Sequence, residues 1–111
     1  MQDEWCEVRA LPPEATSDQE GASSVVAPGQ YRCSRGGTLA VELSRAQRWK
    51  GWTTVAAQTF DAPRTEEWSP ILQTPSAGCV SVQFACSVAH VHDDSSETLA
   101  RTVSRPCSAS G

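Results

Sequence analysis

Five cysteines in a chain of 111 residues constrain the fold more than any other feature of this sequence. Cys79 and Cys86 lie on one segment, residues 79–92, whose side chains alternate as they do in a strand. Strand side chains repeat with a period of two, so their separation of seven residues places them on opposite faces. The two cysteines are therefore expected to bond to different partners, one on each side of a sheet.

One face of the predicted 79–92 strand is mainly apolar and is expected to pack against the core. It carries Val80, Val82, Phe84, Cys86 and Val88. The opposite face, which we expect to point outward or toward an edge, carries Cys79, Ser81, Gln83, Ala85 and Ser87. Cys86 is thus placed for a bridge between two sheets, and Cys79 for a bridge near the rim.

The cysteine pairing has more than one solution. Cys33, on an earlier predicted strand, is a reasonable partner for Cys86, as in immunoglobulin-type sandwiches, with Cys79 bonded to Cys107 or Cys6. The alternative pairs Cys33 with Cys79 and Cys86 with Cys107, because four cysteines already allow three connectivities. Since five is odd, one cysteine has no mate, and we expect it to be Cys6 or Cys107.

The cysteine pattern favours an oxidising compartment. No Cys-x-x-Cys pair and no Cys/His set with zinc-finger spacing occurs, so redox-motif and zinc-finger interpretations are weak. Scattered cysteines in a small chain are typical of secreted proteins, whereas the alternative is five buried, reduced cysteines in the cytosol. Met1 precedes acidic residues and no apolar h-region follows, as expected of a mature secreted domain with a start methionine. No apolar run is long enough to span a membrane.

Charge is distributed unevenly along the chain, whose net charge is −4. Residues 1–20 hold six acidic residues against Arg9, a net of −5, so the remainder sums to +1. This predicts an acidic N-terminal arm and linker over residues 1–24, followed by a nearly neutral domain over residues 25–111. Nucleic-acid binding is disfavoured, because it requires a basic face.

Short strand-like segments separated by turn residues follow the linker. They span residues 24–27, 30–34, 38–43, 52–60, 68–74, 79–92 and 98–104, and residues 5–11 form a further candidate edge strand. Such spacing predicts an all-β fold, a small immunoglobulin-like β-sandwich of about seven disulfide-stabilised strands. The main alternative is a short helix over residues 43–50, where Ser44 and Gln47 fit a capping box and Gly51 follows.

The segments Thr38-Leu-Ala-Val-Glu-Leu-Ser-Arg45, Gly51-Trp-Thr-Thr-Val55 and Cys79-Val-Ser-Val-Gln-Phe84 form a recognisable hydrophobic pattern. It resembles that of small secreted immunoglobulin-like or fibronectin-like proteins of actinobacteria. The resemblance covers about half of the chain and implies a fold and a secreted location, without site residues. Some such modules act as adaptors in extracellular assemblies, including secreted toxin particles.

Candidate chemistry is sparse. His90 and His92, beside Asp93 and Asp94, supply two or three potential zinc or copper ligands, but the chain has no third histidine. Nucleophile-elbow, zincin and phosphate-loop motifs are absent from the sequence, and adjacent acids such as Glu66-Glu67 are typical of solvated loops. We therefore predict no enzyme activity, no metal and no cofactor.

Two clusters are candidates for binding another secreted protein. One combines Arg45, Arg48 and Trp49, since Arg and Trp dominate binding hot spots. The other is Trp5 with the acidic Asp3 and Glu4. This arm either docks on a partner as a peptide or folds back as the first strand, pinned by a Cys6 bridge.

These clusters predict an adaptor or structural subunit of an extracellular complex. The first alternative is a secreted hydrolase inhibitor that presents Arg64 in the loop 61–70. The second is a carbohydrate-binding module that stacks a glycan on Trp49, Trp52 or Trp68, although Trp52 is expected to belong to the core.

Overall fold

The computed structural model describes residues 4–17, 23–93 and 96–107. All regular secondary structure in these ranges is β-strand. The ten strands are β1 (Cys6–Ala10), β2 (Glu14–Ser17), β3 (Ser23–Val26), β4 (Pro28–Cys33), β5 (Gly37–Gln47), β6 (Gly51–Ala62), β7 (Leu72–Gln73), β8 (Ala77–Gly78), β9 (Phe84–Asp93) and β10 (Ser96–Ser104). The all-β prediction is confirmed, with ten strands in place of about seven. No helix in the described ranges is long and apolar enough to cross a membrane.

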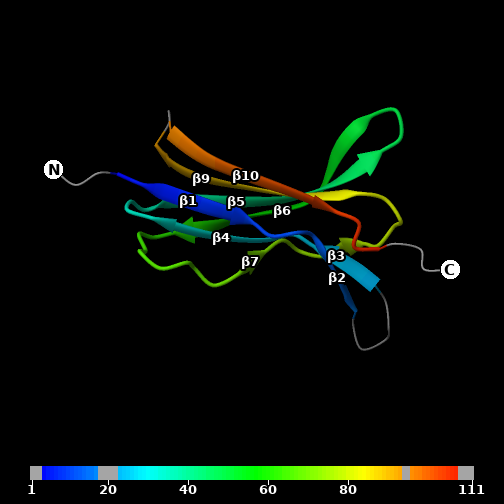
Figure 1. Ribbon diagram of the computed structural model, residues 1–111, viewed down its shortest axis with the longest axis horizontal. Helices are drawn as coiled ribbons and strands as arrows, with labels where there is room; N and C mark the ends of the chain where they lie inside the picture. The colour runs from blue at the N-terminus through cyan, green and yellow to red at the C-terminus, as the bar shows by residue number, and fades with distance from the viewer. Residues whose placement is uncertain (1–3, 18–22, 94–95, 108–111) are drawn as a thin grey trace.

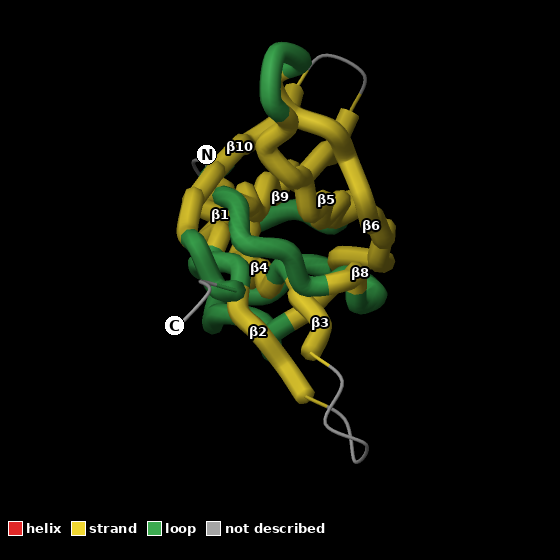
Figure 2. The backbone as a smooth tube through the Cα atoms, turned by 90° about the vertical axis from the view of Figure 1, so that its right-hand side faces the viewer, coloured by secondary structure: helices red, strands yellow, loops and turns green. Residues whose placement is uncertain are grey.

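The strands form three sheets, all with antiparallel pairing (Figure 1). The largest has four strands in the order β10-β9-β5-β6, and the two smaller ones have the orders β1-β4-β7 and β2-β3-β8. Figure 2 shows the four-stranded sheet arching over the smaller sheets. The molecule therefore has two layers, with the four-stranded sheet as one of them.

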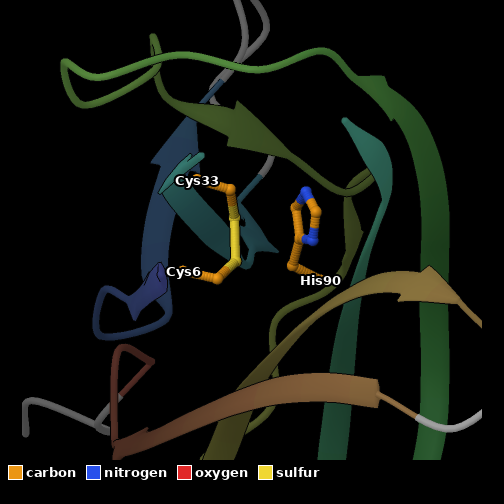
Figure 3. A group of neighbouring side chains, drawn as sticks. All are labelled: Cys6, Cys33 and His90. Carbon is orange, nitrogen blue, oxygen red and sulfur yellow. A yellow bond between two sulfur atoms is a disulfide. The ribbon is translucent and has the colours of Figure 1, made fainter. Parts of the chain in front are cut away.

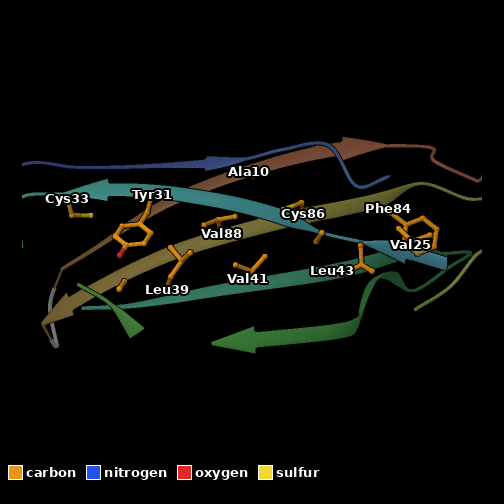
Figure 4. Packing of buried hydrophobic residues seen from close by; sticks show 12 residues of the cluster. Ala10, Val25, Tyr31, Cys33, Leu39, Val41, Leu43, Phe84, Cys86 and Val88 are labelled. Carbon is orange, nitrogen blue, oxygen red and sulfur yellow. The ribbon is translucent and has the colours of Figure 1, made fainter. Parts of the chain in front are cut away.

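The core fills the space between these layers (Figure 4). β5 and β9 are paired so that Leu39, Val41 and Leu43 lie opposite His90, Val88 and Cys86. Because alternate residues of a strand share a face, these side chains point together toward the smaller sheets. There they meet a second set of buried residues: Ala10, Val25, Tyr31 and Cys33.

The predicted core face of residues 79–92 is confirmed for Phe84, Cys86 and Val88 and, as a half-buried residue packed against the core, for Val82, but not for Val80. Phe84, Cys86 and Val88 are buried, but β9 begins at Phe84, and Val80 lies exposed in the loop before it. Ala85, expected to face solvent, is also fully buried.

An irregular segment covers the free edge of β4. Cys33 and Thr65 each donate a backbone hydrogen bond to the other. The Tyr31 N–H donates to Ser69 Oγ, and the Ser69 N–H donates to the Tyr31 carbonyl. Only Leu72–Gln73 of the predicted 68–74 strand pairs regularly, as β7. This segment therefore provides hydrogen-bond partners for the backbone groups of β4 at that edge, although it does not form a long strand.

The alternative helix over residues 43–50 is wrong. β5 continues to Gln47, and a turn over residues 48–50 leads into β6. Ser44 and Arg45 pair with β9 on one side and β6 on the other, so their backbone groups are committed to the sheet. Tertiary pairing on both sides overrides the local capping pattern.

The N-terminal segment is part of the fold. β1 pairs with β4 along its whole length, and the predicted linker contains β2 and the start of β3, which form a hairpin. The backbone N–H of Trp5 donates to Ser34 Oγ at 2.8 Å, and the N–H of Ser34 donates to the Trp5 carbonyl at 2.8 Å. The described start of the acidic arm is therefore ordered against β4 and continues into the first strand, β1, as the second interpretation of the sequence proposed.

The disulfides differ from the preferred pairing. Cys6 is bonded to Cys33, and Cys79 to Cys107, so that Cys86 is the free thiol. Of the predicted bridges only Cys79–Cys107 is correct. The bridges Cys33–Cys86, Cys33–Cys79 and Cys86–Cys107 do not form, and the prediction that Cys6 or Cys107 is unpaired is wrong.

Distance along β4 explains why Cys86 and Cys33 do not meet. The Cys86 thiol donates a hydrogen bond to the Pro28 carbonyl at 3.2 Å, at the first residue of β4. Cys33 is the last residue of that strand, and five residues at about 3.3 Å each separate the two positions by roughly 17 Å. Cys33 instead lies directly opposite Cys6 of β1.

The buried thiol gives a direct test of this pairing. Burial raises the pKa of Cys86 to about 12, so the native protein should resist alkylation at pH 8. Unfolding in denaturant without a reductant should expose one reactive thiol per chain. Iodoacetamide labelling followed by peptide mass spectrometry measures both quantities. A label on Cys6 or Cys107, or rapid labelling of the native chain, would contradict the pairing.

Candidate functional site

The outer face of the four-stranded sheet, which points away from the core, is the largest candidate surface. Three cross-strand rows run over it from β10 through β9 and β5 to β6. The first contains Leu99, Ala89, Ala40 and Thr59; the second Arg101, Ser87, Glu42 and Ala57; the third Val103, Ala85, Ser44 and Thr54. The middle strands thus carry mostly small residues, and the edge strand β10 carries long ones.

This arrangement makes the outer face hollow. A depression of about 470 Å³ lies over β5, β9 and β10. Small side chains of the central strands form its floor, and Glu42, Leu99 and Arg101 stand around it. Leu99 is 66% exposed, a large apolar side chain without a cover in the described part of the chain.

A contact between Arg101 and Trp52 spans the outer face. The Arg101 guanidinium lies 4.9 Å from the centre of the Trp52 ring, although the two residues belong to the opposite edge strands β10 and β6. Ala85 and Ser44, whose strand positions place them on the same face, are buried as well. Trp52 itself is 40% exposed, so its expected place in the core is wrong.

The long side chains of β10 point outward because its small and hydroxyl side chains face inward. Thr102 Oγ1 donates to the Ala10 carbonyl, and Ser104 Oγ donates to the Pro13 carbonyl at 2.7 Å. These bonds satisfy carbonyls next to β1 and leave Leu99, Arg101 and Val103 outside. Sequence reasoning missed these residues, since the larger side chains of an alternating strand are normally assigned to the core.

The turn between β5 and β6 carries two of the predicted binding residues, Arg48 and Trp49. It projects from the body of the molecule (Figure 1). The Arg48 guanidinium lies 5.5 Å from the centre of the Trp49 ring, and Trp49 is 90% exposed. Arg45, the third predicted residue, follows Leu43 by two positions and lies half-buried on the inner side of β5. The structure therefore joins Arg48 with Trp49 and separates them from Arg45.

Trp49 also has a backbone that tryptophan rarely adopts. Its φ is +73°, in the left-handed region that favours glycine, and Gly51 in the same turn has φ +74°. An exposed aromatic in a strained conformation contributes little to stability. Such strain is found preferentially at functional positions, which makes Trp49 a binding candidate.

The N-terminal candidates lie far from that turn. Trp5 is partly exposed, and the Glu4 carboxylate pairs with Arg35 at 2.9 Å. Asp3 lies outside the described residues. In Figure 1 the start of β1 and the β5–β6 turn are near opposite ends of the molecule. The two predicted clusters therefore do not form one site.

The other candidate residues have partners within the chain. The Trp68 ring contacts two guanidinium groups, those of Arg9 at 3.8 Å and Arg32 at 4.8 Å, which compete with a sugar for the ring faces. Arg64 forms a 3.1 Å ion pair with Glu66. The loop around it is tied to β4 through Thr65.

A second candidate site surrounds the Cys6–Cys33 disulfide (Figure 3). His90, on the inner face of β9, is fully buried beside it, and neither ring nitrogen has a hydrogen-bond partner in the described structure. Burial lowers the pKa of His90, and the neighbouring His92 lowers it further. The Asp93 side chain and Asp94 lie outside what the structure describes, so the predicted histidine–carboxylate cluster is represented by its histidines alone.

Comparison of the chain with known protein families, curated proteins and solved structures finds no match in any of the three. The resemblance to secreted immunoglobulin-like proteins therefore remains a prediction, and functional inference depends on the site geometry.

Gly37 is the residue that admits the His90 ring. A Cβ at this position would lie 2.3 Å from the Val91 carbonyl oxygen and 2.8 Å from His90 Cε1. Gly37→Ala should therefore lower the free energy of unfolding by about 1–3 kcal/mol through overpacking. Gly78→Ala is the matched control, because a Cβ there meets no atom within 4 Å and should change stability by less than about 0.5 kcal/mol. Equal effects in urea unfolding would refute the assignment.

Replacing Trp49 by a residue that tolerates its backbone conformation should stabilise the protein. Asparagine tolerates the left-handed region, whose cost for other residues is about 1–2 kcal/mol, so Trp49→Asn should raise the free energy of unfolding by about 0.5–1 kcal/mol. Lys50→Asn, at the next exposed position of the turn, should have no such effect. Thermal unfolding of both variants measures the difference. Destabilisation by Trp49→Asn would show that the tryptophan serves the fold.

Proposed function

We propose that this protein is a secreted, non-enzymatic protein-binding module with an immunoglobulin-like β-sandwich fold. Its binding surface is the outer face of the four-stranded sheet, together with the β5–β6 turn. The partner is another secreted protein, so the chain acts as an adaptor or structural subunit of an extracellular complex. Two disulfides in a small domain are compatible with this location.

One observation carries the proposal, namely where the exposed apolar side chains gather. Eight large apolar side chains are exposed in the described part of the chain, and four of them lie on the outer face: Trp52, Val91, Leu99 and Val103. Leu99 lines the depression, and the other three lie in cross-strand rows on either side of it. Scattered apolar residues are normal on a protein surface, but several on one face beside a depression are typical of an interaction site.

The surrounding charges indicate what kind of partner this surface suits. Among the described residues of the outer face, Glu42, Asp61 and Glu97 lie with Arg101, whose guanidinium already contacts Trp52, while Arg48 and Lys50 belong to the adjoining turn. A partner that buries an apolar segment in the depression and directs basic side chains toward these acids would be complementary. At the end of the surface, Trp49 provides the type of exposed aromatic anchor that dominates interface energies.

Leu99→Glu tests the proposal, because it places a charge at the centre of the apolar cluster. The immobilised wild-type chain is used to capture proteins from the culture medium of its source, and each identified protein is then titrated by surface plasmon resonance. Leu99→Glu should weaken binding of the true partner at least tenfold, about 1.4 kcal/mol.

Ile71→Glu is the matched control, since Ile71 is an exposed aliphatic residue in the loop before β7, away from the outer face. Its affinity should equal that of the wild type. If every captured protein binds the two variants alike, the outer face is not the binding surface.

A further inference from the structure

We propose that Cys6, Cys33, His90 and His92 bind one zinc ion when the Cys6–Cys33 disulfide is reduced. The proposal is independent of the outer face and of the function proposed for it. It reverses the expectation of no metal, which rested on the absence of a third histidine and of zinc-finger spacing in the sequence.

The two cysteines are held side by side by strand pairing as well as by their bond. Cys6 and Cys33 are directly opposite each other in the β1–β4 ladder. The backbone N–H and carbonyl of Cys33 are both bonded to Thr65, so the Cys6–Cys33 pair is a non-hydrogen-bonded one, in which side chains approach most closely. Reduction therefore leaves two thiols facing each other on a paired framework.

His90 completes a group of three potential ligands from a third strand, β9. The Sγ atoms of Cys6 and Cys33 and a ring nitrogen of His90 all lie within 4.8 Å of one another. Figure 3 shows the His90 ring beside the disulfide. In a tetrahedral zinc site, bonds of about 2.0–2.3 Å imply ligand separations of about 3.3–3.8 Å. The two sulfurs must therefore move apart once their bond is cleaved, and the imidazole must move slightly toward them.

The hydrogen bonding of His90 independently indicates a ligand. Its Nδ1 and Nε2 are both buried, and neither makes a hydrogen bond of normal geometry in the described structure, although the nearby backbone of Ala62 acts to raise the pKa of the ring. Buried polar atoms are nearly always satisfied, so an unpaired imidazole next to two sulfurs requires an explanation. Gly37 and the Tyr31 ring, whose centre is 5.3 Å away, fix the ring in this position.

His92 supplies the fourth ligand, and it lines a pocket through which zinc can reach the site from solvent. It follows His90 by two residues on the same face of β9; the ring centres are 5.9 Å apart, and its Nδ1 is also buried and unpaired. A pocket of about 160 Å³ is lined by His92, Cys6 and Cys33, with Glu4, Trp5 and Arg35 around them. Two thiolates and two imidazoles form one of the donor sets that bind zinc in structural sites.

The disulfide determines whether the site exists. A phosphine reductant cleaves the S–S bond, and water supplies the oxygen of the phosphine oxide and the protons of the two thiols. Zinc then displaces both thiol protons to solvent and bonds to the thiolates. In the oxidised chain the sulfurs have no thiolate form, and two histidines alone bind zinc weakly.

The test uses the full chain, reduced anaerobically with a phosphine and titrated with Zn²⁺ and, in parallel, Co²⁺. The reduced wild type should bind one equivalent of zinc, and cobalt should give visible bands of tetrahedral intensity with a thiolate-to-cobalt charge-transfer band. The oxidised wild type should bind at least 100-fold more weakly. Equal binding by the oxidised chain, or no stoichiometric binding by the reduced one, overturns the proposal.

Variants separate the site from unspecific thiol binding. Cys79→Ser/Cys107→Ser is the matched control, because it removes the other cysteine pair and should retain one equivalent and the cobalt spectrum. Cys6→Ser/Cys33→Ser should lose both. His92→Ala, at the less buried ligand, should weaken zinc binding at least tenfold while circular dichroism shows an intact fold. Unchanged affinity in His92→Ala, or loss in the Cys79/Cys107 variant alone, refutes the assignment.

Discussion

The apolar layer between the two sets of strands is the interaction on which the rest of the structure depends. β5 and β9 present Leu39, Val41, Leu43, Phe84, Cys86 and Val88 from one side, and the smaller sheets cover them from the other. Burying apolar surface contributes about 25 cal/mol per Å², and these side chains are fully or almost fully buried. The layer fixes which face of each central strand points inward, and with it the composition of the outer face.

Both candidate sites follow from this constraint. Because β9 uses its large residues for the core, its outer positions are small and form the floor of the depression. His90 continues the inward series of Phe84, Cys86 and Val88, so it enters the core at the end where Cys6 and Cys33 meet. The alternation of side chains along β9 therefore places small residues under the outer depression and His90 beside the two cysteines on the inner face.

The cross-links act at places that packing alone holds less firmly. Cys6–Cys33 ties the first strand to β4, and Cys79–Cys107 ties the loop before β9 to the segment after β10. The bonded cysteines are 27 and 28 residues apart, and loops of this length give each disulfide a stabilisation of about 3.6 kcal/mol. Cys86 needs no bridge, since it lies in the middle of the apolar layer and behaves there as a small apolar side chain.

The sequence by itself determined the properties that depend on local alternation and composition. It predicted the all-β class, the approximate positions of β4, β5, β6, β9 and β10, and the burial of Phe84, Cys86 and Val88. Such features follow from the period of two and from turn residues, which are readable within a window of a few residues.

Only the tertiary structure decided which distant residues meet. The Cys6–Cys33 bridge depends on the β1–β4 register, and the outward position of Leu99 and Arg101 depends on hydrogen bonds from the opposite face of β10. His90 lies beside two cysteines from other strands, and the spacing of these three residues along the chain does not predict that they are close together. Register and layer packing join residues far apart in sequence. The pattern of one strand restricts its register by the face that must be buried, but it does not say which strand is the partner.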